Sequence, residues 1–106
     1  MGLLAGMART SLAADDPQAA YGYVTEIVTF LDDGGSLDGT WEPLRIYFTI
    51  YQVLTFLLNP RANEFLEIAY KSLQEMVDKI PDAGARRMFL ENVPWNREIV
   101  TAYSAL

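Results

Sequence analysis

The sequence predicts an all-α fold, in which antiparallel helix pairs stack as a short α-solenoid of about five to six helices. Three observations predict it. Apolar residues recur at steps of three and four along most of the 106-residue chain, which is the spacing of one helix face. Pro, Gly, Asp and Asn gather in short segments between these stretches, where helices start and stop. One start signal occurs twice, which indicates a repeated helix pair.

Two helices are expected before residue 34. Residues 2–13 are expected to form the first, and residues 17–31 the second, whose apolar residues share one face. The segment DDGGSLDGT at residues 32–40 has turn composition, and its adjacent glycines are expected to end the second helix.

The next two expected helices differ in how much of their surface is apolar. Residues 42–58 are apolar most of the way round, on two stripes, so this segment is expected to be the central helix, covered on more than one side. Residues 60–80 carry a single apolar stripe opposite a face rich in Glu and Lys. The second of these helices is therefore expected to bury only one side.

Two shorter helices are expected at residues 82–91 and 96–105, separated by Pro94, with Asp82 capping the first of them. We expect one helical domain over residues 1–106. It comprises a first repeat at about 1–33, a loop at 34–41, a second repeat at about 42–80 and C-terminal capping helices at about 82–105.

The repeated start signal consists of Asp or Asn followed by Pro. Asp16-Pro17 precedes the second expected helix and Asn59-Pro60 the fourth, and the two prolines are 43 residues apart. Asp and Asn accept bonds from free helical amides, and Pro suits the first helical position, where its missing N–H costs nothing. This spacing fits a repeat of about 34 residues that carries a longer loop between repeats.

The stretch AGMARTSLAADDPQAAYGYVTEIVTFL resembles a degenerate tetratricopeptide repeat, with Ala8 and Ala20 where such a repeat needs close helix contact. The stretches LRIYFTIYQVLTFLLNPRANEFLEIAYKSLQEMVDKI and RRMFLENVPWNREI resemble the last repeats of large bacterial multidomain signalling proteins. In those proteins an ATPase, cyclase or transcriptional-activator domain precedes the repeats. Leu4 and Tyr47 stand where the repeat often has Trp, and Asn63 replaces a small residue. The resemblance implies a C-terminal tetratricopeptide-like region that begins part-way along a longer repeat array.

The composition bears on several function classes. The net charge is −6, with basic residues scattered along the chain, which argues against direct binding to nucleic acid or to anionic membranes. The chain has no cysteine and no histidine, so we expect no metal site, no cofactor and no catalytic residue, and hence no enzyme activity. No apolar run is long enough to span a bilayer, and the protein is expected to be soluble and cytoplasmic.

Four residues near the C-terminus, Arg86, Arg87, Trp95 and Arg97, form the first candidate partner-binding group. In one interpretation they are a docking patch, because guanidinium groups bind carboxylates and Trp can anchor a partner. In the other, Trp95 caps the open end of the core while the arginines pair with neighbouring glutamates. Both interpretations stay open at this level.

Two tyrosines of the central helix, Tyr47 and Tyr51, are the second candidate group. Aromatic residues at helical spacing are typical of a core, yet tyrosine hydroxyls can also reach the concave face of a repeat stack and contact a peptide.

The predicted function is a non-catalytic protein–protein interaction or scaffolding module whose partner is a protein, a peptide or a neighbouring domain of the parent protein. The alternative is a sensor for a small ligand or peptide, with a pocket lined by the aromatic central helix. The apolar residues Leu3, Leu4 and Met7 also predict that the isolated chain forms a homodimer through an open face of the first helix.

Overall fold

The computed structural model describes residues 1–37 and 42–106, so residues 38–41 of the expected loop at 34–41 lie outside the described part. Helices are the only regular secondary structure among the described residues, and no strand occurs there. The helices are α1 (Gly2–Ala13), α2 (Pro17–Asp32), α3 (Pro43–Phe56), α4 (Ala62–Asp78), α5 (Ala83–Asn92) and α6 (Pro94–Ser104). The all-α prediction is confirmed, and each bound lies within two residues of its expected position. No helix in these two described ranges is long and apolar enough to cross a membrane.

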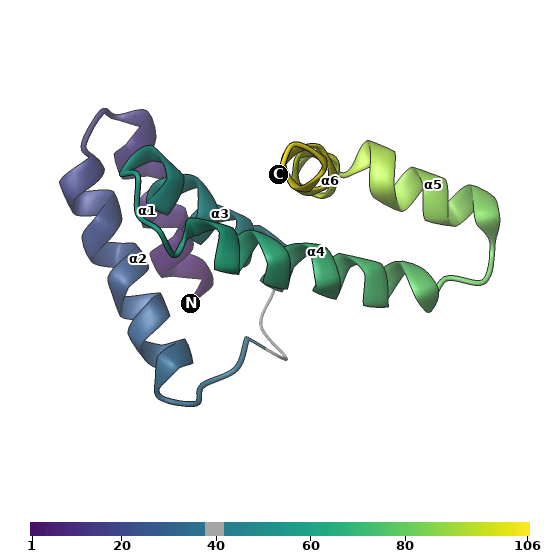
Figure 1. The fold of residues 1–106 in the computed structure, drawn as a ribbon, viewed down its shortest axis with the longest axis horizontal. Helices are drawn as coiled ribbons and strands as arrows, with labels where there is room; N and C mark the ends of the chain where they lie inside the picture. The colour runs from purple at the N-terminus through teal and green to yellow at the C-terminus, as the bar shows by residue number, and fades with distance from the viewer. Residues whose placement is uncertain (38–41) are drawn as a thin grey trace.

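The first four helices form two antiparallel hairpins that lie side by side (Figure 1). Helix α1 packs along α2, and α3 packs along α4, while α3 also lies against both helices of the first hairpin. Within the described residues, the backbones of α2 and α4 do not come into contact. The central position expected for residues 42–58 is therefore confirmed, because α3 alone among these four helices contacts all the others.

The last two helices are placed differently from the second hairpin. Helix α5 runs back alongside α4, and α6 lies across α3 and α4 (Figure 1). A regular continuation of the stack would set α5 against α3, whereas in the described residues α5 contacts only α4 and α6. Helix α6 begins at Pro94, so this proline is the first helical residue and not a separator, as its missing N–H allows.

Two apolar clusters form the core, and α3 contributes to both. The first joins α1, α2, α3 and the start of α4, and includes Ile27, Ile50 and Phe65. The second joins α3, α4 and α6, and includes Leu73 and Ile99. The two apolar stripes of α3 thus face two separate clusters, which explains why this helix is apolar most of the way round.

Small residues set the contact between α1 and α2. Ala5, Ala8 and Ala20 are all completely buried where these helices pack together. The close helix contact expected at Ala8 and Ala20 is therefore present, because alanine side chains let two helix backbones approach each other closely. By contrast, α5 buries no residue completely and depends on its neighbour α6 for most of its contacts.

The same C-terminal turn ends α1 and α3. In each, the residue after the cap adopts a left-handed conformation, Asp15 with φ 60° and Leu58 with φ 57°. The following amide, of Asp16 or Asn59, donates to a carbonyl five residues back, which is the Schellman pattern. These paired residues are 43 positions apart. Helix α2 ends in the same way, with Gly34 at φ 93° and the amide of Gly35 donating to the carbonyl of Phe30, as expected for its adjacent glycines.

Two details of the second turn correct the sequence-based expectation. Residue Leu58, expected on an apolar stripe of the central helix, lies beyond the end of α3 and is 89% exposed. Helix α4 starts at Ala62 and not at Pro60, because Asn59 Oδ1 accepts from the amide of Arg61 at 2.9 Å and holds a turn there. The corresponding Asp16 does cap α2 as expected, by accepting from the amide of Ala19.

We predict that Leu58→Gly stabilises the protein by about 1 kcal/mol, because an L-residue is strained in the left-handed region and glycine is not. Urea unfolding followed by circular dichroism measures the change. Leu58→Ala is the matched control, since it removes the same exposed side chain but keeps a Cβ. An equal gain in both variants would attribute the effect to the lost apolar surface and would refute the explanation from backbone strain.

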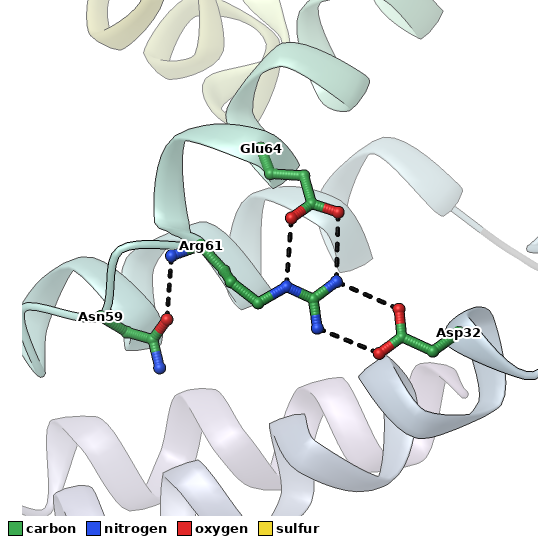
Figure 2. Close-up of polar contacts among 4 residues, drawn as sticks. All are labelled: Asp32, Asn59, Arg61 and Glu64. Atoms are coloured by element: carbon green, nitrogen blue, oxygen red, sulfur yellow. Dashed lines mark hydrogen bonds and ion pairs between the residues drawn. The ribbon is translucent and has the colours of Figure 1, made fainter.

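Arg61 joins the ends of the two hairpins (Figure 2). Its guanidinium donates two hydrogen bonds of 3.0 Å to the carboxylate of Asp32, the last residue of α2, and two of 3.1 Å to Glu64 in α4. The hydrogen bonds from Arg61 lower the pKa of Asp32, and those that Arg61 donates to Asp32 and then Glu64 raise the pKa of Arg61. This clamp bridges α2 and α4, whose backbones do not meet.

The clamp predicts an acid-sensitive contribution to stability. Because the pKa of Asp32 is lower in the folded than in the unfolded chain, its contribution is present above the ordinary aspartate pKa of about 4 and is lost as the pH falls through the folded-state pKa. Asp32→Asn should therefore be less stable than the wild type at pH 7, and the difference should vanish in strong acid. Urea unfolding of both proteins across this pH range measures it, and a pH-independent difference would contradict the prediction.

Candidate functional site

The structure places Arg86 and Arg87 on α5, where both are exposed. Arg86 Nε donates to the carbonyl of Ile80, just before the helix, and Arg87 Nε lies 3.4 Å from a carboxylate oxygen of Glu91. The pair between Arg87 and Glu91 is the kind of contact that the capping interpretation expected for the arginines. Both side chains of this pair are more than half exposed, so it contributes little to stability.

Trp95 and Arg97 are separated by their positions on α6. Arg97 is exposed, whereas Trp95 is half-buried and packs against the second core cluster. The guanidinium of Arg45 in α3 lies over the ring of Trp95, with its central carbon 4.9 Å from the ring centroid. In the described part of the chain no hydrogen bond or ring contact joins Trp95 to Arg86, Arg87 or Arg97.

Tyr47 and Tyr51 lie between the two core clusters. Both are half-buried on α3 and pack against both clusters, and the ring of Tyr51 stacks on that of Phe48 with centroids 5.6 Å apart. Their apolar surfaces therefore belong to the core, while part of each side chain reaches the surface.

A cationic pair that the sequence did not reveal lies where α1 meets the first half of α3. Arg9 Nη1 donates to the hydroxyl of Thr49 at 2.8 Å, and that hydroxyl in turn donates to the carbonyl of Arg45. Thr49 is only 1% exposed, so its two hydrogen bonds fix the spacing of α1 and α3 at this point. The two guanidinium groups consequently share one region of the surface.

Among the described residues of this region, cationic groups outnumber carboxylates. Glu42 Oε2 lies 3.3 Å from Nη1 of Arg45, but Arg9 forms no ion pair with any carboxylate of the described residues. Partial burial and then the neighbouring Arg45 cation lower the pKa of Arg9, and Glu42 only partly opposes this. Among residues 1–37 and 42–106, one carboxylate thus faces the two guanidinium groups.

Two surface cavities flank the cationic pair. One, of about 170 Å³, is lined by Gly2, Arg9, Glu42, Arg45 and Ile46. The other, of about 200 Å³, has a mainly apolar lining that includes Leu44, Met76, Phe89, Val93 and Trp95. Glu42 lines both cavities, and Arg45 lies over Trp95 between them, so they adjoin. We call the two cavities together the junction site.

Asn96 adds an unpaired polar atom to the junction site. It lines the apolar cavity and is 1% exposed, and its Nδ2 donates to the carbonyl of Phe89 at 3.1 Å. Its Oδ1 is buried and has no hydrogen-bond partner among the described residues. A buried acceptor without a partner is costly, so Asn96 is the least satisfied polar side chain in the wall of the apolar cavity.

A wider cavity of about 530 Å³ lies on the outer face of α4, beside the stacked rings of Tyr70 and Tyr103. Its charged lining residues, Glu64, Glu67 and Lys71, include no second cation. The junction site differs by combining two guanidinium groups, an aromatic ring and an unpaired buried acceptor.

Sequence reasoning identified Trp95 but missed Arg9, Arg45 and Asn96. Arg9 and Arg45 are isolated cations in apolar stretches, and this isolation was the available signal, because such residues need a polar partner or solvent when their helix packs. That the two cations meet depends on how α1 and α3 pack together. Asn96 carried no signal, since asparagine near a helix start is ordinary in sequence.

Comparisons with protein-family models, with curated proteins and with solved structures find no match to this chain. The site is therefore interpreted from its own chemistry.

Proposed function

We propose that this chain is a non-catalytic protein–protein interaction module that holds its partner at the junction site. The observation that carries the proposal is the pair of guanidinium groups, Arg9 and Arg45, placed beside a half-buried Trp in an otherwise acidic chain. Arginine and tryptophan are the residues most enriched among those that dominate binding energy in protein interfaces.

The repeated turns support a second part of the proposal, that the chain is the end of a tetratricopeptide-like array in a larger regulatory protein. The hairpins α1–α2 and α3–α4 share a turn conformation 43 residues apart. The terminal pair departs from the pattern of the first two, as the last unit of a stack does when it covers the open end. In this proposal the module serves a bacterial signalling or transcription-regulatory protein in the cytoplasm.

A selection from a library of displayed random peptides tests the interaction proposal. Peptides enriched on the wild-type chain should lose binding to Trp95→Ala and to Arg45→Ala, while each variant's melting temperature shows whether it is still folded. Loss of binding with unchanged melting supports docking at the junction site. Failure to enrich any peptide, or enrichment that is indifferent to both substitutions, refutes the proposal.

The alternative function is a small-ligand sensor, favoured by the apolar cavity next to Asn96. In this version the pocket lies among α3, α4, α5 and α6. Leu44 of α3 lines it, whereas Tyr47 and Tyr51 do not. A bound small molecule would raise the melting temperature by mass action. A thermal-shift screen with apolar compounds that carry a hydrogen-bond donor tests it, and the absence of any shift counts against it.

Self-association through α1 is a separate expectation. Leu3 is 78% and Met7 38% exposed on this helix, while Leu4 packs partly against the core. These side chains give two copies an apolar surface to share. We predict a concentration-dependent increase of mass in light scattering that Leu3→Ser with Met7→Ser abolishes. A constant monomeric mass of the wild type at high concentration would contradict it.

A further inference from the structure

The geometry points to a partner class for the junction site: we propose that it binds a short peptide in which a carboxylate lies next to an apolar side chain. The carboxylate binds Arg9 and Arg45, and the apolar side chain enters the cavity beside Trp95. The inference rests on the proposed function and adds the chemistry of the partner.

The charge of the cationic cavity supplies the first step. Arg9 uses one of its donors on Thr49, and the carboxylate of Glu42 bonds to Arg45. Guanidinium groups present five donors in a planar fork that matches a carboxylate. A carboxylate placed between the two arginines would add charge-assisted hydrogen bonds and neutralise the repulsion between the cations.

The structure of Arg45 supplies the second step. Its guanidinium stacks on the ring of Trp95 and bonds to Glu42, so it is held in place before any ligand arrives. A held side chain loses little conformational entropy on binding, which favours affinity. Because Arg45 lines one cavity and stacks on the wall of the other, a ligand that reaches both has its charged and apolar groups close together.

The apolar cavity supplies the third step, which favours a peptide over a simple organic acid. Its mainly apolar lining includes Leu44, Met76, Phe89 and Trp95. A peptide can place an apolar side chain in this cavity while a neighbouring carboxylate reaches the arginines, whereas a simple organic acid carries no second group to fill it.

The overall charge decides between a peptide and a polyanion. Nucleic acids and anionic membranes present many phosphates and would be repelled by a chain of net charge −6. A single carboxylate responds mainly to charges within a Debye length of about 8 Å at physiological ionic strength, and Arg9 and Arg45 both line the cavity that would receive it. The proposed ligand therefore carries one carboxylate at this position and an apolar neighbour.

Fluorescence anisotropy with defined peptide pools tests the inference. One pool contains fluorescein-labelled, C-terminally amidated hexapeptides with a fixed central Glu and random flanking residues drawn from Leu, Phe, Trp, Gly and Ser. The second pool replaces the fixed Glu by Gln, and a third replaces it by phosphoserine. A labelled DNA duplex provides the polyanion. All four probes are measured against the intact wild-type chain.

We expect the Glu pool to bind at least about tenfold more tightly than the Gln pool, because charge-assisted hydrogen bonds distinguish the two. Arg9→Gln and Arg45→Gln should each remove most of this preference. Lys79→Gln is the matched control, since it removes one exposed cation at the end of α4, outside both cavities, and should leave the preference unchanged. Thermal unfolding shows whether each variant is still folded, because Arg9→Gln removes the hydrogen bond to Thr49 as well as the repulsion from Arg45.

Three outcomes would overturn the inference. Equal binding of the Glu and Gln pools to the wild type would refute the carboxylate, and this comparison needs no variant to fold. If the Gln pool bound the wild type but not Trp95→Ala, the proposed interaction function would survive and only the carboxylate of the proposed ligand would be refuted. Tighter binding of the phosphoserine pool or of DNA would identify phosphate as the ligand chemistry.

Discussion

Phe65→Ala is expected to lower the free energy of unfolding by about 3–5 kcal/mol, the largest single loss in this chain. Phe65 of α4 is 2% exposed and lies in the first core cluster. This cluster also contains buried residues of α1, α2 and α3, so Phe65 helps to hold the two hairpins together. Removing its ring loses the burial of a large apolar surface and leaves a cavity that the surrounding helices can only partly fill. Domains of this size are stable by about 5–15 kcal/mol, so the variant should be close to unfolding.

Urea unfolding followed by circular dichroism measures the loss, and the chain supplies its own control. Phe56, the last residue of α3, is 57% exposed, and Phe56→Ala should change the stability by no more than about 0.5 kcal/mol. Similar losses in the two variants would mean that Phe65 does not join the hairpins as the structure places it.

Ile99→Ala is expected to have the second-largest effect, a loss of about 2–5 kcal/mol. Ile99 is completely buried and is the residue through which α6 enters the second core cluster, against α3 and α4. Because α5 has most of its contacts with α6, loosening α6 should loosen the entire terminal pair. The junction site should then be disrupted as well, since Trp95 and Asn96 are both on α6.

The fluorescence of Trp95 measures this loosening directly. It is observed in a Trp41→Phe background, because Trp41 is the other tryptophan of the sequence. Its emission should shift to longer wavelength in Ile99→Ala, because the ring becomes more accessible to water. Met88→Ala is the control, since Met88 is an apolar residue of the same terminal pair but is 62% exposed. A stable Ile99→Ala variant with unshifted emission would show that α6 is held by contacts other than this side chain.

The helices could be predicted because local chemistry defines them. The apolar periodicity of residues 60–80 predicted the buried face of α4, and Asp82 caps α5 by accepting from the amide of Ala85 as expected. Two of the errors concern the residue at which a helix starts. Asn59 formed a turn that moved the start of α4 to Ala62, and Pro94 opened α6 because a helix can begin at proline.

The candidate site was much less predictable. Trp95 was selected from the sequence, but its partner Arg45 was not, and the arginines proposed to accompany it lie elsewhere on the surface of α5 and α6. Periodicity describes one helix at a time, so it gives the face on which a residue lies but not the residue that it meets. Arg9 was not selected from the sequence, although its position against Thr49 is what assembles the cationic cavity.

By itself, the sequence determined that this chain is helical and where its helices begin and end to within two residues. Those properties depend on contacts between residues close together in the chain, which a single sequence displays. Only the tertiary structure decided that α6 packs on both helices of the second hairpin while α5 contacts only α4 of that hairpin, and that Arg9, Arg45 and Trp95 converge. Such contacts join residues far apart in the chain, and they depend on which of several apolar faces pack together with the fewest voids.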